Sequence, residues 1–555
     1  LAAFCLLLQP GLSPAAAPAP LKDRTSGVVV SSHVLANQIG KRVLAQGGNA
    51  VDAAVAVGYA LSVVHPAAGN IGGGGFAIIH MKDGQSIALD FREKAPLKAT
   101  RDMYLDKEGN VVPGLSTLGY KAAGVPGTVA GMSAMLEKYG TKKLPELMAP
   151  AIRLAEEGYR INARQEESMA EFAPDLAKFA SSRKYFLKPD GSSYKEGDLF
   201  VQKDLAKSLR AISDKGPAAF YSGSIADFIV KDMRDNGGLI SKEDLAKYTV
   251  AWREPVKGSY RGYELISMSP PSSGGTHIIQ IFNIMENADI GSMGFASSSA
   301  IHLMAEAMRH AYADRSEYMG DPDFVPVPVD KLISKEYARE IYEKIVANKD
   351  KAVPSKDVRP GLPLNEGNNT THYSVVDSWG NAVAVTYTIN ESYGSAAAVM
   401  GAGFLLNNEM DDFSVKAGVP NIYGLVGNDA NSIAPEKRPL SSMSPTIVLK
   451  DGKLFMIAGS PGGSRIITTT LQVISNVIDH KMNISEAVMA PRIHMQWLPD
   501  ELRVEKYGLV KDVEETLKKM GYTIEVKEPM GDVNAILVDQ ESGTMYGSGD
   551  PRAEF

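Results

Sequence analysis

The stretch Thr370-Thr371-His372-Tyr373-Ser374-Val375-Val376-Asp377 decides how the fold of this chain is interpreted. Its β-branched and aromatic residues favour a β-strand. A turn signal follows at residues 378–381, and a second strand pattern runs over residues 382–390. Two such runs joined by a short Gly/Asn turn predict a β-hairpin. Before the hairpin, residues 359–369 are rich in Gly, Pro and Asn, which predicts an irregular loop.

The register of this hairpin is expected to bring a second hydroxyl group beside its first residue. A turn centred on Trp379 places Thr370 opposite Thr388. Directly opposed residues of an antiparallel pair lie on one face of the sheet, a few ångströms apart. Asn390 falls on the same face, because strand residues alternate between the two faces. We therefore expect Thr370, Thr388 and Asn390 to be neighbours.

A threonine at this point of a chain has two interpretations. Its hydroxyl is a weak nucleophile unless a base lies beside it. If the preceding peptide bond is cut, the α-amine of the threonine itself becomes that base. The alternative is that Thr370 merely begins a strand, which its β-propensity favours. The hairpin alone leaves both interpretations open.

Four further motifs accompany the hairpin in a fixed order. They are Asp90-Phe91-Arg92-Glu93, Leu406-Asn407-Asn408-Glu409-Met410-Asp411-Asp412-Phe413, Arg438-Pro439-Leu440-Ser441-Ser442-Met443-Ser444-Pro445-Thr446 and Gly459-Ser460-Pro461-Gly462-Gly463-Ser464-Arg465. Together with the hairpin they resemble the bacterial γ-glutamyltranspeptidases, also called γ-glutamyltransferases or glutathione hydrolases. The resemblance extends from about Gly27 to Phe555. It implies an α/β fold, the four-layer αββα sandwich of the N-terminal-nucleophile hydrolases, and the succession of strand and helix patterns is compatible with that fold.

The resemblance implies catalytic roles for four residues. Thr370 is the expected nucleophile, and Thr388 assists it by hydrogen bonding. The N–H groups of Gly462 and Gly463 are expected to stabilise the oxyanion. A Gly-rich turn between a strand and a helix suits this role, because its N–H groups lie at the positive end of the helix. Without the resemblance, residues 459–463 would be an ordinary strand-to-helix connection.

The resemblance also implies a set of residues that hold the amino-acid end of a γ-glutamyl substrate. Arg92, Ser441 and Ser442 are expected to bind its α-carboxylate, and a guanidinium suits a carboxylate well. Asn390, Glu409 and Asp412 are expected to bind its α-ammonium group. Tyr423 is expected to face the site from a lid formed by residues 420–427. Read on their own, these acidic residues and this Gly/Asn-rich segment would be solvated loops.

The organisation of the chain follows from the same resemblance. We expect a precursor that cuts itself between Asn369 and Thr370 into a large subunit, residues 18–369, and a small subunit, residues 370–555. The two would form one interleaved domain. Residues 1–17 combine an apolar run with small residues at positions 15–17, which is typical of a signal peptide that lacks its beginning. A periplasmic or secreted protein is therefore expected, and a flexible Ala/Pro tail is the alternative.

Composition excludes several other classes of function. The chain has 58 basic and 65 acidic residues without a long basic run, which argues against a nucleic-acid partner. Its only cysteine is Cys5, so no disulfide is expected in the mature protein. The nine histidines show no metal-ligand spacing, and no cofactor is expected. The expected partners are glutathione, glutamine, and amino-acid or dipeptide acceptors.

Other segments carry weaker predictions. Residues 72–75 predict close backbone packing at the start of a strand rather than a phosphate loop. Residues 401–406 predict a strand, and Asp314 and Arg315 are interpreted as structural ion-pair residues. The loop 270–275 receives no role. Two alternative functions stay open: a related amidase such as a glutaryl-cephalosporin acylase, and a periplasmic glutamate-binding protein without turnover.

Overall fold

The computed structural model describes residues 21–23, 26–358, 370–416, 418–419, 421 and 427–552. The predicted signal peptide, the residue before the predicted cleavage point, Asn369, and the predicted lid residue Tyr423 lie outside this part of the chain.

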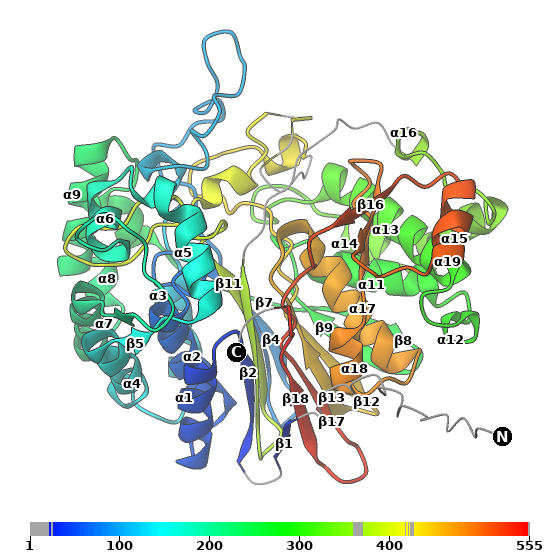
Figure 1. Ribbon diagram of the computed structural model, residues 1–555, viewed down its shortest axis with the longest axis horizontal. Helices are drawn as coiled ribbons and strands as arrows, with labels where there is room; N and C mark the ends of the chain where they lie inside the picture. The colour runs from blue at the N-terminus through cyan, green and yellow to red at the C-terminus, as the bar shows by residue number, and fades with distance from the viewer. Residues whose placement is uncertain are drawn as a thin grey trace, which may run out of the picture.

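Two antiparallel sheets form the centre of the fold (Figure 1). The six-stranded sheet has the order β2 (Gly27–Ser31), β10 (Thr371–Asp377), β11 (Ala382–Thr388), β3 (Gly74–His80), β4 (Ser86–Phe91) and β7 (Ala251–Arg253). The seven-stranded sheet has the order β1 (Leu21–Asp23), β18 (Met545–Ser548), β17 (Ala535–Val538), β13 (Lys453–Ala458), β12 (Thr446–Lys450), β9 (Tyr263–Ser267) and β8 (Val256–Tyr260). Each sheet therefore combines strands from both sides of Thr370. In the six-stranded sheet β10 and β11 lie between β2 and β3, and in the seven-stranded sheet β18, β17, β13 and β12 lie between β1 and β9.

The two sheets pack on each other through one shared core. Phe76 and Ile78 of the first sheet belong to the same buried cluster as Ile266, Ile447 and Ile457 of the second. Two more small sheets lie outside this centre: β5 (Tyr159–Arg160) with β6 (Leu199–Phe200), and β14 (Ile493–His494), β15 (Leu502–Glu505) and β16 (Ile524–Lys527).

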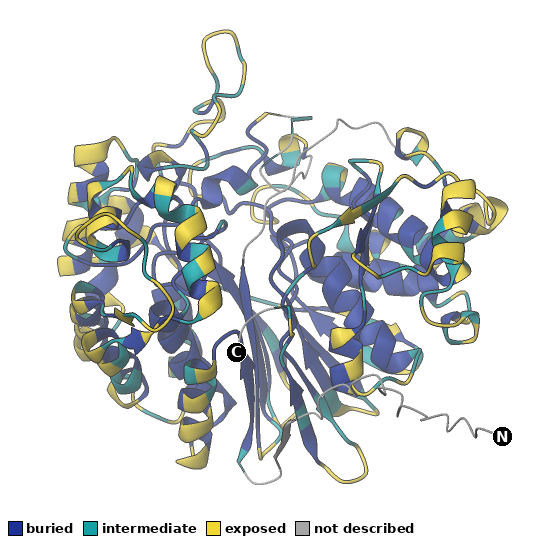
Figure 2. Ribbon diagram, viewed as in Figure 1, coloured by how far each residue is buried: buried dark blue, intermediate teal, exposed yellow. Residues whose placement is uncertain are grey.

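Helices cover the outer face of each sheet, and their exposed residues point away from it (Figures 1 and 2). The six-stranded sheet carries α1 (Val34–Ala45), α2 (Ala50–Val64) and α3 (Thr128–Tyr139), with α4 (Leu144–Glu157), α5 (Ala163–Leu176), α6 (Ala180–Phe186), α7 (Lys203–Lys215), α8 (Ala218–Tyr221), α9 (Ser224–Asn236) and α10 (Lys242–Lys247) around them. The other side holds α11 (Gly274–Met285), α12 (Ile290–Met293), α13 (Ser298–Tyr318), α14 (Val329–Leu332), α15 (Lys335–Ala347), α16 (Ser355–Val358), α17 (Ile466–Ile478), α18 (Ile484–Met489) and α19 (Lys511–Lys519). The α/β class that the sequence predicts is confirmed.

The β10–β11 hairpin is buried on both faces. Every residue of both strands is buried. Tyr373 and Val385 pack into the core shared with the helices, whereas Val376 and Ala384 pack into the core between the sheets. The alternation of strand side chains thus turns the face that carries Thr370 and Thr388 toward the space between the sheets.

The hairpin register agrees with the prediction. Thr371 pairs with Tyr387, and Val376 pairs with Ala382. This is the pairing that a turn centred on Trp379 requires, and it leaves Thr370 beside Thr388.

The glycine-rich segment 72–75 packs against neighbouring backbone, as predicted. A Cβ atom at Gly73 would lie 2.0 Å from the carbonyl oxygen of Thr388, and one at Gly75 would lie 2.5 Å from that of Thr386. Only glycine permits this approach of β3 to β11.

The predicted strand at residues 401–406 is wrong. Gly401 and Gly403 have φ angles of +87° and +80°, outside the extended region. The segment folds back on itself, because the N–H of Leu406 donates to the carbonyl of Ala397 and the N–H of Val399 donates to that of Phe404. The apolar residues fill a tight loop instead of a ladder.

Within the described ranges, no helix combines the length and the apolar character needed to cross a bilayer.

The carboxylate of Asp377 fastens the hairpin turn to helix α2. It accepts hydrogen bonds from the N–H groups of Trp379 and Asn381, from the Asn381 side chain and from the N–H of Ala50, all at 2.6–2.9 Å. We predict that Asp377→Ala lowers the free energy of unfolding by about 2–4 kcal/mol, because several buried donors lose a charged acceptor. Chemical denaturation measures this loss.

The matched control is Asp83→Ala in the exposed turn between β3 and β4. Asp83 accepts a hydrogen bond from the N–H of Gln85 at the surface. Its replacement should change the free energy of unfolding by about 0.5 kcal/mol or less. Equal effects of the two substitutions would contradict the role given to Asp377.

Candidate active site

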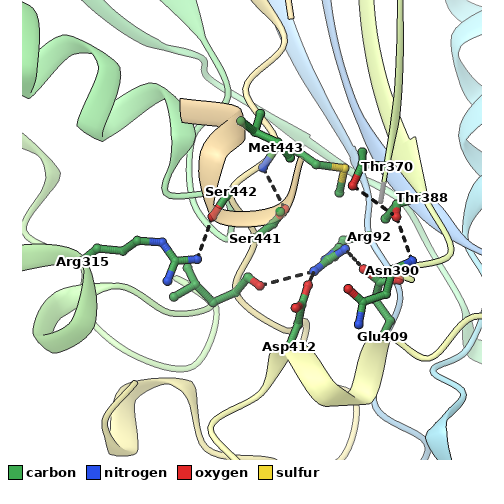
Figure 3. Close-up of a pocket in the computed structure, with 13 residues that line it drawn as sticks. Arg92, Arg315, Thr370, Thr388, Asn390, Glu409, Asp412, Ser441, Ser442 and Met443 are labelled. Atoms are coloured by element: carbon green, nitrogen blue, oxygen red, sulfur yellow. Dashed lines mark hydrogen bonds and ion pairs between the residues drawn. The ribbon is translucent and has the colours of Figure 1, made fainter. Parts of the chain in front are cut away.

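A pocket lies where the hairpin ends between the two sheets (Figure 3). Its lining brings together residues that are far apart in the sequence: Arg92, Arg315, Thr370, Thr388, Asn390, Glu409, Asp412, Leu440, Ser441, Ser442, Met443, Gly463 and Ile466. The space between these residues, open solvent included, is about 290 Å³. Most of the residues that the sequence singles out for catalysis and substrate binding therefore meet at one place.

Two threonine hydroxyls face each other in this pocket. Thr370 precedes β10 directly, and Thr388 ends β11. The Oγ atom of Thr370 lies 3.4 Å from that of Thr388, and the Thr388 oxygen also accepts the N–H of Asn390 at 2.7 Å. The chain leaves β11 at Asn390 with a φ of +74°, a conformation that asparagine tolerates better than most residues. This bend carries Asn390 into the pocket.

Arg92 lies at the centre of the charged part of the pocket. It follows β4 and is buried completely. Its Nε and Nη2 atoms donate to the carbonyl groups of Pro439 and Leu440 at 3.4 and 3.3 Å, and its two Nη atoms form ion pairs with Glu409 and Asp412. The guanidinium is therefore held on all sides by groups of fixed position.

Three buried carboxyl groups share this one guanidinium. Glu409 and Asp412 contact it, and an oxygen of Glu93 lies 3.6 Å from it. Burial raises the pKa of all three carboxyl groups, that of Glu93 to about 8. The Oε2 atom of Glu409 accepts no hydrogen bond from the described residues. The cluster can therefore accept a further cationic donor such as an ammonium group.

Ser441 and Ser442 form the opposite wall of the pocket. The Oγ atom of Ser441 accepts the N–H of Met443 at 3.1 Å, and that of Ser442 accepts the Nη2 of Arg315 at 3.0 Å. Arg315 reaches this wall from helix α13, which the sequence gives no reason to place there. The interpretation of Arg315 as a structural ion-pair residue is wrong, because its guanidinium donates to the hydroxyls of Ser442 and Ser273.

The glycine-rich turn after β13 passes close to Thr370. Gly462 and Gly463 have φ angles of +133° and +55°, which suit glycine. Gly463 lines the pocket, and Gly462 precedes it directly. The turn rests on the ring of His372, since a Cβ atom at Gly459 would come within 2.3 Å of that ring. Strand β10, which follows Thr370, and the turn are thus in direct contact.

A second, larger cleft meets the pocket at Thr370. Its space, open solvent included, is about 2020 Å³. It is lined by residues from α5, from the chain after Asn390 and from residues 528–532, among them Glu391 and Asp532. Thr370 lines both this cleft and the small pocket. A ligand that spans the two would contact Thr370.

Of the predicted site residues within the described ranges, only Gly462 does not line the small pocket. In the whole described part of the chain there is no group of three or more His, Cys, Asp or Glu side chains that could hold a metal ion. The sequence gives no functional role to four other residues that line the pocket: Arg315, Leu440, Met443 and Ile466. No local signal marks them, because their motifs also fit ordinary helix and core positions.

Known proteins with similar sequences and structures were found for nearly the whole chain. The family model described as Gamma-glutamyltranspeptidase matches residues 36–554. The chain is 53% identical over 528 residues to the glutathione hydrolase proenzyme of Escherichia coli K12, which covers 95% of this chain and 90% of that protein. The structure is similar to the cephalosporin acylase of Bacillus halodurans, with a TM-score of 0.85, 26% identity and coverage of 99% and 98%. It is also similar to a Helicobacter pylori gamma-glutamyltranspeptidase chain, with a TM-score of 0.61 and 62% identity over 63% of this chain and 100% of that one.

The buried carboxyl of Asp532, behind the glycine-rich turn, makes stability depend on pH. The Oγ of Ser32 donates to it at 2.6 Å, and its own backbone N–H donates to Ser460 of the turn. Burial, reinforced by the nearby Asp550, raises its pKa from 3.8 to about 7. Between these two values the folded protein holds a proton that the unfolded chain has lost, so stability falls as pH rises.

We predict that Asp532→Asn removes this loss. The thermal midpoint of the variant minus that of the wild type should therefore increase as pH rises from 3.8 to about 7. Above about pH 7 this difference should stay constant. Thermal unfolding across this pH range measures the difference. A difference that does not change with pH would show that Asp532 carries no raised pKa.

Proposed function

Because this chain belongs to the gamma-glutamyltranspeptidase family, we propose that it is a self-processing γ-glutamyltransferase and glutathione hydrolase with Thr370 as its nucleophile. It cleaves the γ-glutamyl amide bond of glutathione and related compounds through a γ-glutamyl-threonine ester. The glutamyl group then passes to water or to an amino acid or peptide.

One observation carries this proposal: Thr370 stands between a small charged pocket and a large cleft. An enzyme that divides an amide must hold the acyl half firmly and let the amine half leave. The small pocket offers charged and hydroxyl groups for the acyl half. The cleft offers room for the leaving amine and, after it, for an acceptor amine or water. The bond to be cut would lie over the Thr370 hydroxyl.

The charges of the small pocket fit the amino-acid end of a glutamyl group. In the structure Arg92 is paired with Glu409 and Asp412. A ligand that carries both a carboxylate and an ammonium can exchange with these pairs and leave no buried charge unpaired, which would otherwise be costly. The carboxylate would bind Arg92, Ser441 and Ser442, and the ammonium would bind Asn390, Glu409 and Asp412.

The chemistry then follows from the position of each group. Thr370 Oγ attacks the γ-carbonyl carbon, while its free α-amine takes the hydroxyl proton. The Thr388 hydroxyl, 3.4 Å away, keeps the Thr370 hydroxyl aligned. The N–H groups of Gly462 and Gly463 stabilise the oxyanion, and the proton then passes to the leaving amine as the amide bond breaks. Water or an acceptor amine attacks the resulting ester and restores the threonine.

The precursor would supply the free amine by cutting itself between Asn369 and Thr370. The large subunit, 18–369, and the small subunit, 370–555, would remain one interleaved domain, because in each sheet strands of the small subunit lie between strands of the large one. We infer that the arrangement is the four-layer αββα sandwich of the N-terminal-nucleophile hydrolases. The apolar residues 1–17 support export to the periplasm or the medium.

A related amidase is the second candidate, because the fold resembles that of a cephalosporin acylase. A glutaryl group has the length of a glutamyl group but lacks its ammonium. It would leave the Glu409 and Asp412 carboxylates without a cationic partner from the ligand. Rates on γ-glutamyl and glutaryl anilides decide between the two, and faster cleavage of the glutaryl compound would favour the amidase. A binding protein without turnover would cleave neither anilide and would not cut itself.

We predict that Thr370→Ala yields one uncut chain without activity. The substitution removes the oxygen that both the self-cleavage and the acyl transfer require. Intact mass spectrometry should show two fragments for the wild type, the lighter beginning at Thr370, and one for the variant. Finding two fragments in the variant would exclude Thr370 as the nucleophile of self-cleavage.

The control is Thr371→Ala. Its hydroxyl lies 3.0 Å from that of Ser32, on the opposite face of β10 from Thr370. We expect this variant to be cut like the wild type, and an uncut chain would show that the processing defect is not specific to Thr370.

A further inference from the structure

Arg315 is a buried cation that forms no ion pair with a carboxylate of the described residues, although the more distant Asp412 still acts on its charge. It lies in the last turn of α13 and is 3% exposed. Its Nε donates to Ser273 Oγ at 2.9 Å and its Nη2 to Ser442 Oγ at 3.0 Å. Among the residues that the structure describes, no carboxylate comes within 4.0 Å of this guanidinium. Burial lowers the pKa of Arg315 to about 10. Arg92, in contrast, is in contact with two carboxylates.

Such a charge indicates a place for an anion. A buried ion without a counterion costs free energy, and a bound carboxylate would offset that cost. Arg315 lines the same small pocket as Arg92, and Figure 3 shows the two arginines on different sides of Ser441 and Ser442, with Arg315 joined to Ser442. An anion at this wall would have a guanidinium on either side.

The hydroxyl protons of the wall are left for such an anion. Ser441 Oγ accepts a hydrogen bond from the N–H of Met443, and Ser442 Oγ accepts one from Arg315. Neither hydroxyl donates to an acceptor within the described part of the chain, although both residues are buried. A hydroxyl oxygen that accepts from a guanidinium must direct its own proton elsewhere. Here the free direction is the pocket.

The loop that sequence analysis leaves without a role completes this wall. Ser273 Oγ accepts from Arg315 and donates to the carbonyl of Ser441 at 2.7 Å. Ser272 Oγ donates to the carbonyl of Met443 at 2.6 Å. The loop 270–275 thus fixes the backbone of the wall, and Arg315 bridges the loop and the wall.

We propose that Arg315 is a positioning residue for the α-carboxylate of the substrate: it turns the Ser442 hydroxyl toward that carboxylate and adds a second buried positive charge beside Arg92. This inference rests on the proposed function, because it takes the carboxylate to be that of a γ-glutamyl group. If Arg315 only braced the wall, its loss would weaken every ligand of the pocket alike.

The test compares two ligands that differ only in this carboxylate. L-Glutamate has it, and 4-aminobutanoate keeps the amine and chain but lacks it. Calorimetry gives the Kd of each, and the hydrolysis of their p-nitroanilides gives kcat and KM. We expect Arg315→Met to weaken L-glutamate about 10- to 100-fold, as the loss of a charged hydrogen-bonding partner does, and to raise KM rather than lower kcat. Binding of 4-aminobutanoate should change less than about 3-fold.

Three further variants distinguish a specific effect of Arg315 from misfolding. Arg315→Lys keeps the charge and should recover part of the preference for L-glutamate. Ser273→Ala keeps the guanidinium but removes one of its acceptors, so it should show a smaller loss of the same kind. Arg309→Met is the matched control, because Arg309 is a buried arginine of the same helix that pairs with Glu306 and Asp500. It should lower the thermal midpoint without separating the two ligands.

The outcomes distinguish the inference from the function on which it rests. If Arg315→Met weakens the binding of both ligands equally, or of neither, the proposed role of Arg315 is overturned. The proposed function is still upheld in that case if the wild type cleaves the γ-glutamyl anilide. A third outcome would uphold the role of Arg315 and overturn the proposed reaction. In that case the wild type prefers L-glutamate to 4-aminobutanoate, Arg315→Met abolishes this preference, and the wild type cleaves no anilide. A wild type that binds neither ligand overturns both.

Discussion

The burial of the β10–β11 hairpin on both faces is the constraint on which the rest of this structure depends. One face packs against the helices around α2, and the other packs against the second sheet. A strand in this position cannot shift by one residue, because every side chain would move to the wrong core. The Asp377 carboxylate fastens the turn at one end. At the other end Thr370 and Thr388 therefore have a fixed position between the sheets, which is what the proposed nucleophile and its hydrogen-bonding partner would need.

Close contacts of the backbone extend this fixed position to the rest of the site. Gly73 and Gly75 allow β3 to approach β11, and Gly459 allows the glycine-rich turn to rest on the His372 ring. A larger residue at any of these positions would move one wall of the pocket relative to Thr370. The backbone of the site is therefore fixed mainly by packing, and this backbone positions the polar side chains. Such preorganisation is what transition-state stabilisation by fixed N–H groups requires.

The charged part of the pocket is arranged around two arginines with different surroundings. Arg92 is held by Glu409 and Asp412, whereas Arg315 is held by two serine hydroxyls. The pocket is thus divided into a side rich in carboxylates and a side rich in hydrogen-bond donors. A zwitterionic head group matches such a division in only one orientation. This would place the far end of a glutamyl chain, and so its γ-carbonyl, toward Thr370.

The sequence by itself determined the hairpin, its register and the strands around β3, β4, β12 and β13, because these features depend on local patterns of alternation and turn residues. It indicated most of the candidate site only through the resemblance of its motifs to a known family, since residues such as Glu409 and Asp412, taken alone, also fit solvated loops. The tertiary structure alone decided that residues 401–406 form a loop, since the left-handed glycines there satisfy the backbone through contacts within the loop. It also brought Arg315 and the loop 270–275 to the serine wall. A charged residue in a helix looks the same in sequence whether it pairs at the surface or enters a pocket, because its partners come from distant segments that only packing brings together.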